Sequence, residues 1–313
     1  MKAGLGIDIG GTNVKILILD EKKRVLFKDR FKTNSEKGLR DFFARLGASV
    51  KEAVRKTGLR VKKVAVGMAG DIDSNRGILR YSPNLGGWKN APVAKLISQQ
   101  TGLSCVVEND ANMAAWGAYI IELDRKSCNM AALTMGTGIG GGLVLGGRLY
   151  HGCSSTAGEI GHMVIEPGGR LCGCGNSGCL EAYCGSKAIV KRALSLVRDV
   201  DSYRKKYGVG EEKKINAAAL ASAAGKGDSA AIRVWEETGF YLSIGIGNLL
   251  MLLNPDSIVI TGGVSKGKKY FLPALKKGLA CYSIRTPLKA VKIKVSENPD
   301  LGSYGAALFA MEK

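Results

Sequence analysis

The chain has 313 residues, of which 45% are hydrophobic and 23% are charged, and its formal net charge is +19. This composition can bury a sizeable core, which excludes a largely disordered chain. The basic balance points to nucleic acid as a possible partner. However, the lysine runs are spread along the whole chain and aromatic residues make up only 6%. We interpret the charge as a solvated, lysine-rich surface and expect no nucleic-acid partner.

A membrane location is disfavoured by the apolar segments of the chain. The apolar stretch at residues 244–253 is interrupted by Gly245, Gly247 and Asn248, whereas a spanning helix needs about 20 apolar residues. Asp8 breaks the first apolar run, which argues against a signal peptide. We therefore predict a cytoplasmic protein without a membrane partner, in which disulfides are rare and the eight cysteines need another explanation.

The first part of the chain alternates between strand and helix patterns. Apolar periodicity predicts strands at residues 5–9, 14–19, 24–30, 61–68 and 105–107, and helices at 36–57 and 110–121. Either Asn109 or Asp110 is the predicted N-cap of the second helix.

The opening pattern returns after residue 129. Residues 130–135 are predicted as a strand, 136–142 as a glycine-rich turn and 143–145 as the return strand, which echoes the strands around Gly10-Gly11-Thr12. An internal echo of this length predicts two related halves, and we place the boundary between them near residues 118–129.

The glycine-rich turns predict phosphate binding. Gly136, Gly138 and Gly141 match the spacing of a dinucleotide fingerprint, but a strand follows them where that fingerprint requires a helix. Two glycine turns that each carry a threonine can still offer N–H groups and a hydroxyl to phosphate oxygens. Ordinary hairpin turns are the alternative. Asp8, a carboxylate inside an apolar strand, favours phosphate binding because it suits Mg²⁺ held through water.

These motifs together resemble those of the ROK family (repressors, open reading frames and kinases) of the actin-like ATPase superfamily. Residues 8–15 resemble the first phosphate motif of that family, 136–142 its second, and 258–263 its glycine turn near the adenosine. The resemblance runs from residue 6 to about residue 310.

The resemblance implies an α/β fold of the actin-like ATPase (ribonuclease H-like) type, with two domains and an interdomain cleft for ATP. The small domain would comprise residues 1–118 plus 303–313, and the large domain residues 119–302 with a zinc-binding loop at 162–184. ATP and Mg²⁺ would be bound by the following residues: Asp8, Gly10, Gly11, Thr12, Asn13, Lys15, Gly136, Thr137, Gly138, Gly262 and Gly263.

A candidate catalytic base stands in the segment Glu108-Asn109-Asp110-Ala111-Asn112, at the predicted junction of strand and helix. Asp110 is simply a helix cap on one interpretation, but Asp also accepts the proton of an attacking hydroxyl in phosphoryl transfer. The resemblance implies that Asp110 is the base. The family commonly has Gly-Glu where this chain has Gly117-Ala118, which leaves the base in place.

The sugar site is implied by the same resemblance. Residues 83–90 resemble a sugar-facing loop of glucokinases, and residues 157–162 resemble the family's sugar-binding segment. Carboxylates and amides suit a polyol because they form paired hydrogen bonds. The implied sugar ligands are Gly70, Asn84, Asn109, Asp110, Glu159, His162 and Glu181.

A metal site is predicted from the spacing of cysteine and histidine. His162, Cys172, Cys174 and Cys179 form a standard tetrahedral zinc set within a glycine-dense segment, and their spacing matches the zinc motif of the family. Cys184 in place of His162 gives a rival set, and buried thiols without metal are the third interpretation. A filled four-ligand shell would make the zinc structural.

The predicted activity is ATP-dependent phosphorylation of a hexose, with glucose as the first choice and its 6-hydroxyl as the acceptor. N-acetylmannosamine, N-acetylglucosamine and fructose are alternative substrates. A sugar-responsive transcriptional repressor is the alternative from another class, but it needs a DNA-binding domain before the first glycine motif, and only seven residues precede Asp8. We expect a homo-oligomer, either a dimer or a tetramer.

Overall fold

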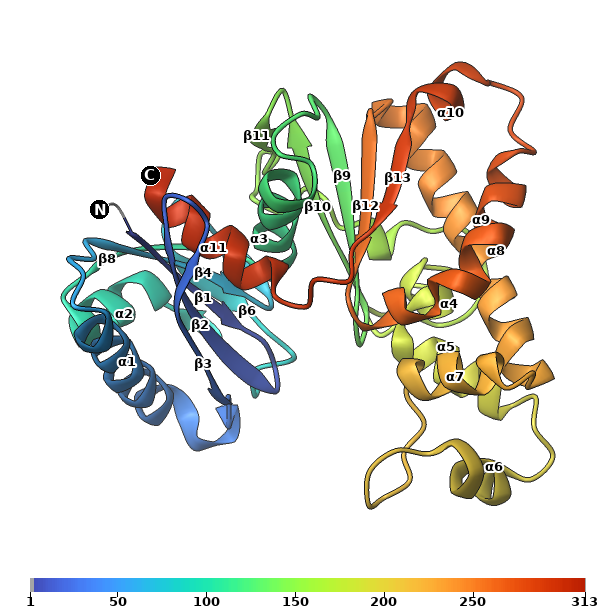
Figure 1. Cartoon of the computed structure of the whole chain (residues 1–313), viewed down its shortest axis with the longest axis horizontal. Coiled ribbons are helices and arrows are strands. Elements are labelled where there is room, and N and C mark those ends of the chain that lie inside the picture. Colours follow the sequence, from blue (N-terminus) through green and yellow to red (C-terminus); the bar gives the residue numbers. More distant parts are fainter. Residues whose placement is uncertain (1–2, 313) are drawn as a thin grey trace. The chain divides into compact units, whose positions relative to one another are not determined.

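The computed structural model describes residues 3–312 (Figure 1). The chain forms two compact units. Unit 1 comprises Met1–Ser127, Gly142–Gly158 and Asp300–Lys313, and unit 2 comprises Cys128–Gly141 and Glu159–Pro299. The sequence-based division at residues 118 and 303 stays a prediction about the domains.

Unit 1 is built on a five-stranded sheet with the order β3-β2-β1-β4-β8. The β1–β2 and β2–β3 pairs are antiparallel, and the β1–β4 and β4–β8 pairs are parallel. The strands are β1 (Ala3–Ile9), β2 (Asn13–Asp20), β3 (Val25–Lys32), β4 (Lys63–Met68) and β8 (Ser104–Asn109). A second, three-stranded sheet contains β5 (Asp71–Asp73), β6 (Ile78–Tyr81) and β7 (Lys89–Ala91).

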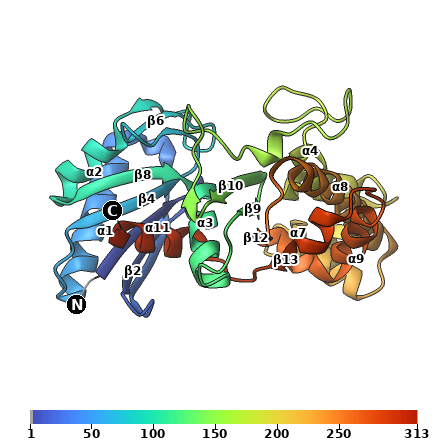
Figure 2. The same cartoon turned by 90° about the horizontal axis from the view of Figure 1, so that it is seen from above.

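The two-residue period of β1 explains how helices cover both faces of this sheet. Leu5, Ile7 and Ile9 are fully buried in the apolar core that also contains residues of α1 (Gly38–Thr57) and α2 (Val93–Thr101). The alternate positions Gly4 and Gly6 face α11 (Leu301–Glu312), which lies along the sheet in Figure 2. A Cβ atom at either glycine would come within 2.2 Å of the backbone of Ala307. The close contact between sheet and helix therefore depends on glycine.

The predicted helix at 110–121 is only partly α-helical. Helix α3 runs over Asp110–Gly117, and Ala118–Glu122 continues as a π-helical turn. Asn109 is the N-cap, because its Oδ1 atom accepts hydrogen bonds from the N–H groups of Ala111 (2.8 Å) and Asn112 (3.3 Å). Of the two predicted caps, Asn109 is confirmed.

The second five-stranded sheet has the order β11-β10-β9-β12-β13, which matches the first sheet strand for strand. The β10–β11 pair is antiparallel, and the β9–β12 and β12–β13 pairs are parallel. The strands are β9 (Met130–Met135), β10 (Ile139–Leu145), β11 (Arg148–Leu149), β12 (Ser257–Thr261) and β13 (Lys292–Val295). The predicted internal echo is thus confirmed by the topology.

The glycine-rich turn between β9 and β10 is shorter than predicted. Residues 139–142 belong to β10 instead of the turn, which spans only Gly136–Gly138. A Cβ atom at Gly142 would lie 2.6 Å from Cβ of Ala115 and 2.9 Å from the carbonyl oxygen of Ala111. This glycine therefore serves helix packing, a requirement that composition alone does not distinguish from a turn.

Most of the helices of unit 2 pack against the longest of them, α8 (Ser229–Leu253). The α-helices of this unit are α4 (Glu181–Cys184), α5 (Ser186–Leu194), α6 (Val200–Tyr207), α7 (Ala217–Gly225), α8 (Ser229–Leu253), α9 (Lys268–Leu279) and α10 (Thr286–Ala290). The apolar stretch at residues 244–253 is the last part of α8. No helix within residues 3–312 is long and apolar enough to cross a membrane.

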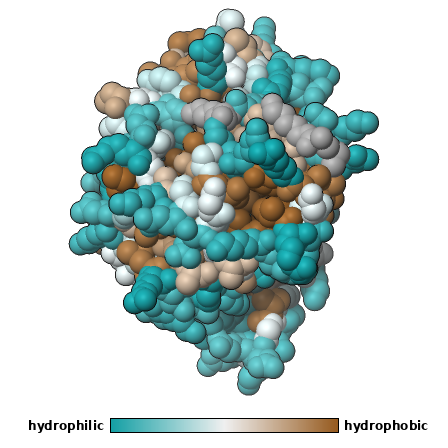
Figure 3. Space-filling model, turned by 90° about the vertical axis from the view of Figure 1, so that its left-hand side faces the viewer, coloured by the Kyte–Doolittle hydropathy of each residue, from teal (hydrophilic) through white to brown (hydrophobic). Residues whose placement is uncertain are grey.

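The surface carries many charged side chains. Hydrophilic residues cover much of the face in Figure 3, with hydrophobic residues exposed between them. Some basic residues pair with acidic neighbours, as Arg55 does with Glu52 at 2.8 Å. Such exposed pairs contribute little to stability.

Candidate active site and metal centre

The first glycine turn, Gly10-Gly11-Thr12, joins β1 to β2 and is held by neighbouring backbone. The N–H group of Gly10 donates to the carbonyl oxygen of Asn13 at 3.0 Å. Thr33, after β3, donates its hydroxyl to the Gly10 carbonyl (2.7 Å) and its N–H group to the Thr12 carbonyl (3.1 Å). The exposed Gly11 and Thr12 thus sit on a fixed base, as phosphate binding requires.

Asn84, predicted to contact the sugar, lies against this turn. A Cβ atom at Gly11 would be 2.8 Å from the carbonyl oxygen of Asn84, so the two predicted binding segments of unit 1 touch. A side chain at position 11 would push them apart.

Asp8 and Lys15 are partners in the register of β1 and β2. The Nζ atom of Lys15 lies 3.6 Å from Oδ2 of Asp8 and 3.3 Å from Oδ1 of Asp300. Burial raises the pKa of the Asp8 carboxyl, and Lys15 offsets part of that effect. Burial also acts to raise the pKa of Asp300, but hydrogen bonds and charge from Lys28 and Lys15 outweigh it and lower that pKa from its ordinary value. The sequence analysis did not find Asp300, because only the fold brings it to β1.

Asn109 and Asp110 stand where β8 passes into α3. Nδ2 of Asn109 donates to the carbonyl oxygen of Gly70 at 3.1 Å, which joins two of the predicted sugar ligands. Gly70 has a φ of 139°, and a Cβ atom there would be 2.7 Å from the carbonyl oxygen of Tyr81. The side chain of Asp110 accepts from the N–H group of Ala111 at 3.0 Å through Oδ1. The aspartate is thus fixed at the first turn of the helix.

The second glycine turn, Gly136–Gly138, is supported by a side chain from α4. Gly136 donates its N–H group to the carbonyl oxygen of Gly138 at 2.9 Å. Oε2 of Glu181 accepts from the N–H group of Ile139 at 2.8 Å. A Cβ atom at Gly138 would lie 2.0 Å from that same Oε2 atom. Glu181, predicted as a sugar ligand, therefore also contacts the predicted phosphate turn.

Two further backbone contacts fix this turn. Ser186, the first residue of α5, donates its N–H group to the carbonyl oxygen of Gly136 at 3.0 Å. Gly161 lies so close to Ile139 that a Cβ atom would be 2.1 Å from its carbonyl oxygen. Gly161 belongs to the 3₁₀ turn Ile160–His162, which follows Glu159 directly. The segment with the predicted sugar ligands Glu159 and His162 is thus packed on the start of β10.

Gly262 and Gly263 follow β12, as predicted for a turn near the adenosine. Gly262 has a φ of 98°, and a Cβ atom there would be 2.5 Å from the carbonyl oxygen of Met135 at the end of β9. A Cβ atom at Gly263 would meet nothing within 4 Å. Only the first of these glycines is required by packing.

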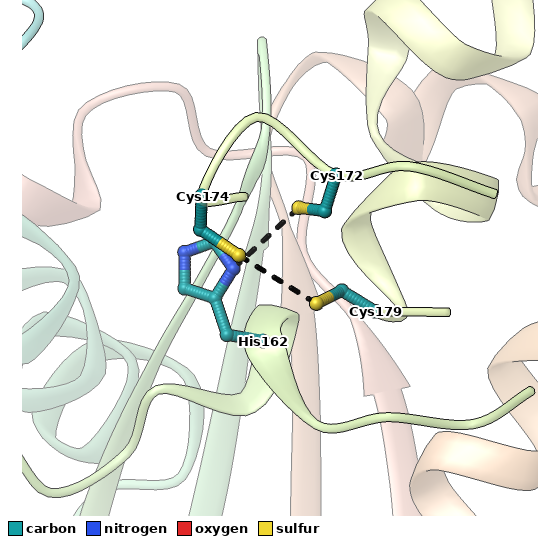
Figure 4. Close-up of side chains that lie close together, drawn as sticks. All are labelled: His162, Cys172, Cys174 and Cys179. Atoms are coloured by element: carbon teal, nitrogen blue, oxygen red, sulfur yellow. Dashed lines mark hydrogen bonds between the residues drawn. The ribbon is translucent and has the colours of Figure 1, made fainter. Parts of the chain in front are cut away.

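His162, Cys172, Cys174 and Cys179 converge in unit 2 (Figure 4). Their ligand atoms all lie within 4.8 Å of one another. Sγ of Cys172 is 3.8 Å from Nδ1 of His162, and the sulfurs of Cys174 and Cys179 are 3.7 Å apart. Zinc–sulfur bonds of about 2.3 Å in a tetrahedron separate two sulfurs by about 3.8 Å. The donor set and its spacing therefore fit a zinc ion.

Cys184, from the rival ligand set, lies outside this cluster. Its sulfur donates to the carbonyl oxygen of Thr238 at 3.5 Å, and the residue is fully buried. Burial strongly raises the pKa of its thiol, which keeps it protonated. Sγ of Cys172 lies 3.8 Å from Oε1 of Glu181. The metal cluster therefore adjoins the side chain that supports the second glycine turn.

The comparisons with known proteins extend over the whole chain. The ROK family matches residues 4–313. A glucokinase of Thermotoga maritima is 31% identical over 316 residues, covering 99% of this chain and 97% of that protein. The structure of a ROK family glucokinase from Streptomyces griseus in complex with glucose and AMPPNP has a TM-score of 0.85 at 29% identity and covers 99% of this chain and 100% of that one. A ROK hexokinase from Thermus thermophilus has a TM-score of 0.80 at 30% identity, over 98% and 97% of the two chains.

Two sheets of the same strand order, each with a glycine turn after its first strand, are the architecture of an actin-like ATPase. With the family match over nearly its full length, this chain belongs to the ROK family.

Proposed function

We propose that this protein is an ATP-dependent hexose kinase that phosphorylates glucose on its 6-hydroxyl. The observation that carries the proposal is the full-length similarity to glucokinases, one of them solved with glucose and AMPPNP. The local geometry supports it. An aspartate held at the first turn of a helix and two glycine turns held by hydrogen bonds are the parts that phosphoryl transfer needs.

Each unit contributes parts of the reaction in this proposal. Asp110 accepts the proton of the 6-hydroxyl as the oxygen attacks the γ-phosphate. The two glycine turns would bind phosphate oxygens through N–H groups, and Asp8 would hold Mg²⁺, which neutralises phosphate charge. Asn84, Asn109, Glu159, His162 and Glu181 are the proposed hydrogen-bonding partners of the sugar.

Zinc has a structural role in this proposal. The four side chains of the cluster would fill a tetrahedral shell and leave no position for a substrate. The ion would fix the 162–179 segment, and with it the ring of His162 and the carboxylate of Glu181. We also infer a cytoplasmic homo-oligomer. Light scattering after size-exclusion chromatography measures the number of its subunits, which we expect to be two or four.

Substitution of the base tests the mechanism. Asp110→Asn keeps an oxygen that can accept from Ala111 and thus keeps the helix start, but it removes the basic carboxylate. We expect turnover to fall by roughly 10²–10⁴-fold, with much less change in sugar affinity measured by calorimetry. Turnover near that of the wild type would remove Asp110 from the role of base.

A panel of sugars tests the substrate. We expect the highest kcat/KM with glucose, a lower value with mannose and the lowest with N-acetylmannosamine and N-acetylglucosamine, measured by coupled release of ADP. The carboxylates Glu159 and Glu181 favour a hydroxyl donor at carbon 2, and an unmatched polar contact lowers kcat/KM strongly. An N-acetyl sugar ranked above glucose would overturn the substrate and leave the kinase standing.

A further inference from the structure

A buried carboxylate stands two residues before the proposed base. Glu108 is only 3% exposed and lies at the end of β8. A buried carboxylate is stable only when hydrogen bonds compensate for lost water. The hydroxyl of Ser74 donates to its Oε2 atom at 2.9 Å, and Nε2 of His151 lies 3.0 Å from its Oε1 atom. Because a carboxylate only accepts hydrogen bonds, Nε2 of His151 carries the proton in this contact.

His151 belongs to the segment 150–158, which we call the strap. The strap closes on itself, because the N–H group of Ala157 donates to the carbonyl oxygen of His151 at 3.1 Å. The guanidinium of Arg80, from β6, donates to the carbonyl oxygen of Ser154 at 3.1 Å. Arg80 is fixed in turn by Asp71 at 2.9 Å. The strap is therefore attached to the rest of unit 1 at two places, one through His151 and the other through Arg80.

The strap joins two parts of the proposed site along the chain. Its last residue, Gly158, is followed directly by Glu159, a proposed sugar ligand. At its other end, His151 contacts Glu108, which adjoins Asn109 and the proposed base Asp110. The end of β8 has two further contacts. The hydroxyl of Ser74 donates to Glu108, and the carbonyl oxygen of Gly70 accepts from Asn109. One imidazole thus connects the chain that leads to the sugar ligands with the strand end that carries the base.

We propose that His151 is a positioning residue for the kinase reaction. Through Glu108 it fixes the strand end before Asp110, and through the strap it fixes the chain that enters Glu159. This inference rests on the proposed function, since it assigns His151 to the same site. His151 does not act on the substrate itself. Its loss lowers the rate because the strand end that carries the base is held less firmly, and small displacements of reacting groups reduce turnover strongly.

Two amide substitutions separate the effect of the hydrogen bond to Glu108 from the effect of side-chain size. In His151→Gln the amide nitrogen takes the place of Nε2 and still donates to Glu108, whereas the shorter His151→Asn does not reach it. We expect His151→Asn and His151→Ala to lower kcat by about 10–100-fold and to raise the KM for sugar. The KM for ATP should change little. His151→Gln should recover most of the loss. Ser154→Ala, in the same strap, is the control, because only its hydroxyl contact with Thr156 is removed.

Hydrogen exchange gives a readout that does not depend on activity. In His151→Asn, amides of residues 150–158 and 108–112 should exchange faster than in the wild type, and in His151→Gln they should not. Equal exchange and equal kcat in the Asn and Gln variants would overturn the proposal. This comparison does not require the His151→Ala variant to fold. A wild type that phosphorylates no sugar would instead overturn the proposed function, and the exchange comparison would still decide whether His151 holds the strap.

Discussion

The two glycine turns occupy equivalent places in two sheets of the same strand order, but different interactions hold them. The first turn lies beside an array of charged side chains, in which Lys15 pairs with Asp8 and Asp300. The second turn is held by Glu181, whose carboxylate accepts from the N–H group of Ile139 and adjoins the metal cluster through Cys172.

This difference shows that the two turns share a strand topology but not the contacts that hold them. The repeated strand order places both turns at the same point of the topology, after the first strand of each sheet. Each turn also has a contact from a segment outside the repeated strands, Asn84 for the first and Glu181 for the second, and these contacts differ in kind. We therefore expect the second turn to depend on metal and on close packing, and the first to depend on packing with Asn84 and on charge.

Loss of the metal should have the largest effect. Cys179→Ala removes one ligand of the cluster, so the purified protein should carry no zinc and show no measurable sugar phosphorylation. Cys184→Ala is the matched control, because that thiol lies outside the cluster. Metal analysis of both proteins by mass spectrometry, with about one zinc per chain in the wild type, checks this. A zinc-free wild type would contradict it, as would zinc retained in the Cys179 variant and lost from the Cys184 variant.

A methyl group on the second turn should have the next largest effect. In Gly138→Ala the new Cβ atom would lie 2.0 Å from Oε2 of Glu181, so the carboxylate must leave its place. We expect kcat/KM to fall by about 10²-fold or more, since both a sugar ligand and a phosphate turn are displaced. In Gly136→Ala, on the same phosphate turn, the Cβ atom meets nothing within 4 Å, so kcat/KM should fall much less than in Gly138→Ala. Equal losses in the two variants would show that Glu181 does not hold the turn.

The sequence predicted the repeat and the metal cluster well, because both depend on local spacing. Strand 130–135 was predicted with the bounds of β9, and the zinc set with histidine matches the cluster. It placed β10 four residues late, since Gly140–Gly142 have the composition of a turn, and the close packing of Gly142 on helix α3 is visible only in the fold.

The partners of the site residues could not be predicted in the same way. Asp300 reaches Lys15 only through the fold, and no local pattern relates them. Glu108 was visible in the motif before the base, but its contact with His151 joins segments that the sequence separates. The assigned roles of the phosphate and sugar residues remain predictions that the substitutions here test.

The same substitution on the first turn should have a smaller effect than on the second. In Gly11→Ala the Cβ atom would lie 2.8 Å from the carbonyl oxygen of Asn84, a smaller overlap than the 2.0 Å at Gly138. We expect the KM for both sugar and ATP to rise, with kcat/KM lower by about tenfold. Gly10→Ala is the matched control, because its nearest contact is 3.4 Å. If Gly11→Ala proves as damaging as Gly138→Ala, the two turns are equally rigid and the comparison fails.

The smallest effect concerns the charges beside the first turn, where two acids share Lys15 and have opposite pKa shifts. The pKa of Asp300 is lowered in the folded protein, so its ionised form stabilises the fold at neutral pH and loses that effect as pH falls through the folded pKa. The pKa of Asp8 is raised because burial disfavours its charge, so its ionisation opposes folding once pH exceeds the folded pKa.

Asp300→Asn should therefore lower the unfolding midpoint at pH 7 by about 2–5 °C, and Asp8→Asn should leave it equal or higher. Both differences should shrink toward pH 3, where the carboxyls of the wild type approach the neutral state that Asn imitates. Thermal unfolding of the three proteins between pH 3 and pH 7 measures this. A lower midpoint for Asp8→Asn at pH 7 would mean that its ion pair with Lys15 outweighs the effect of burial.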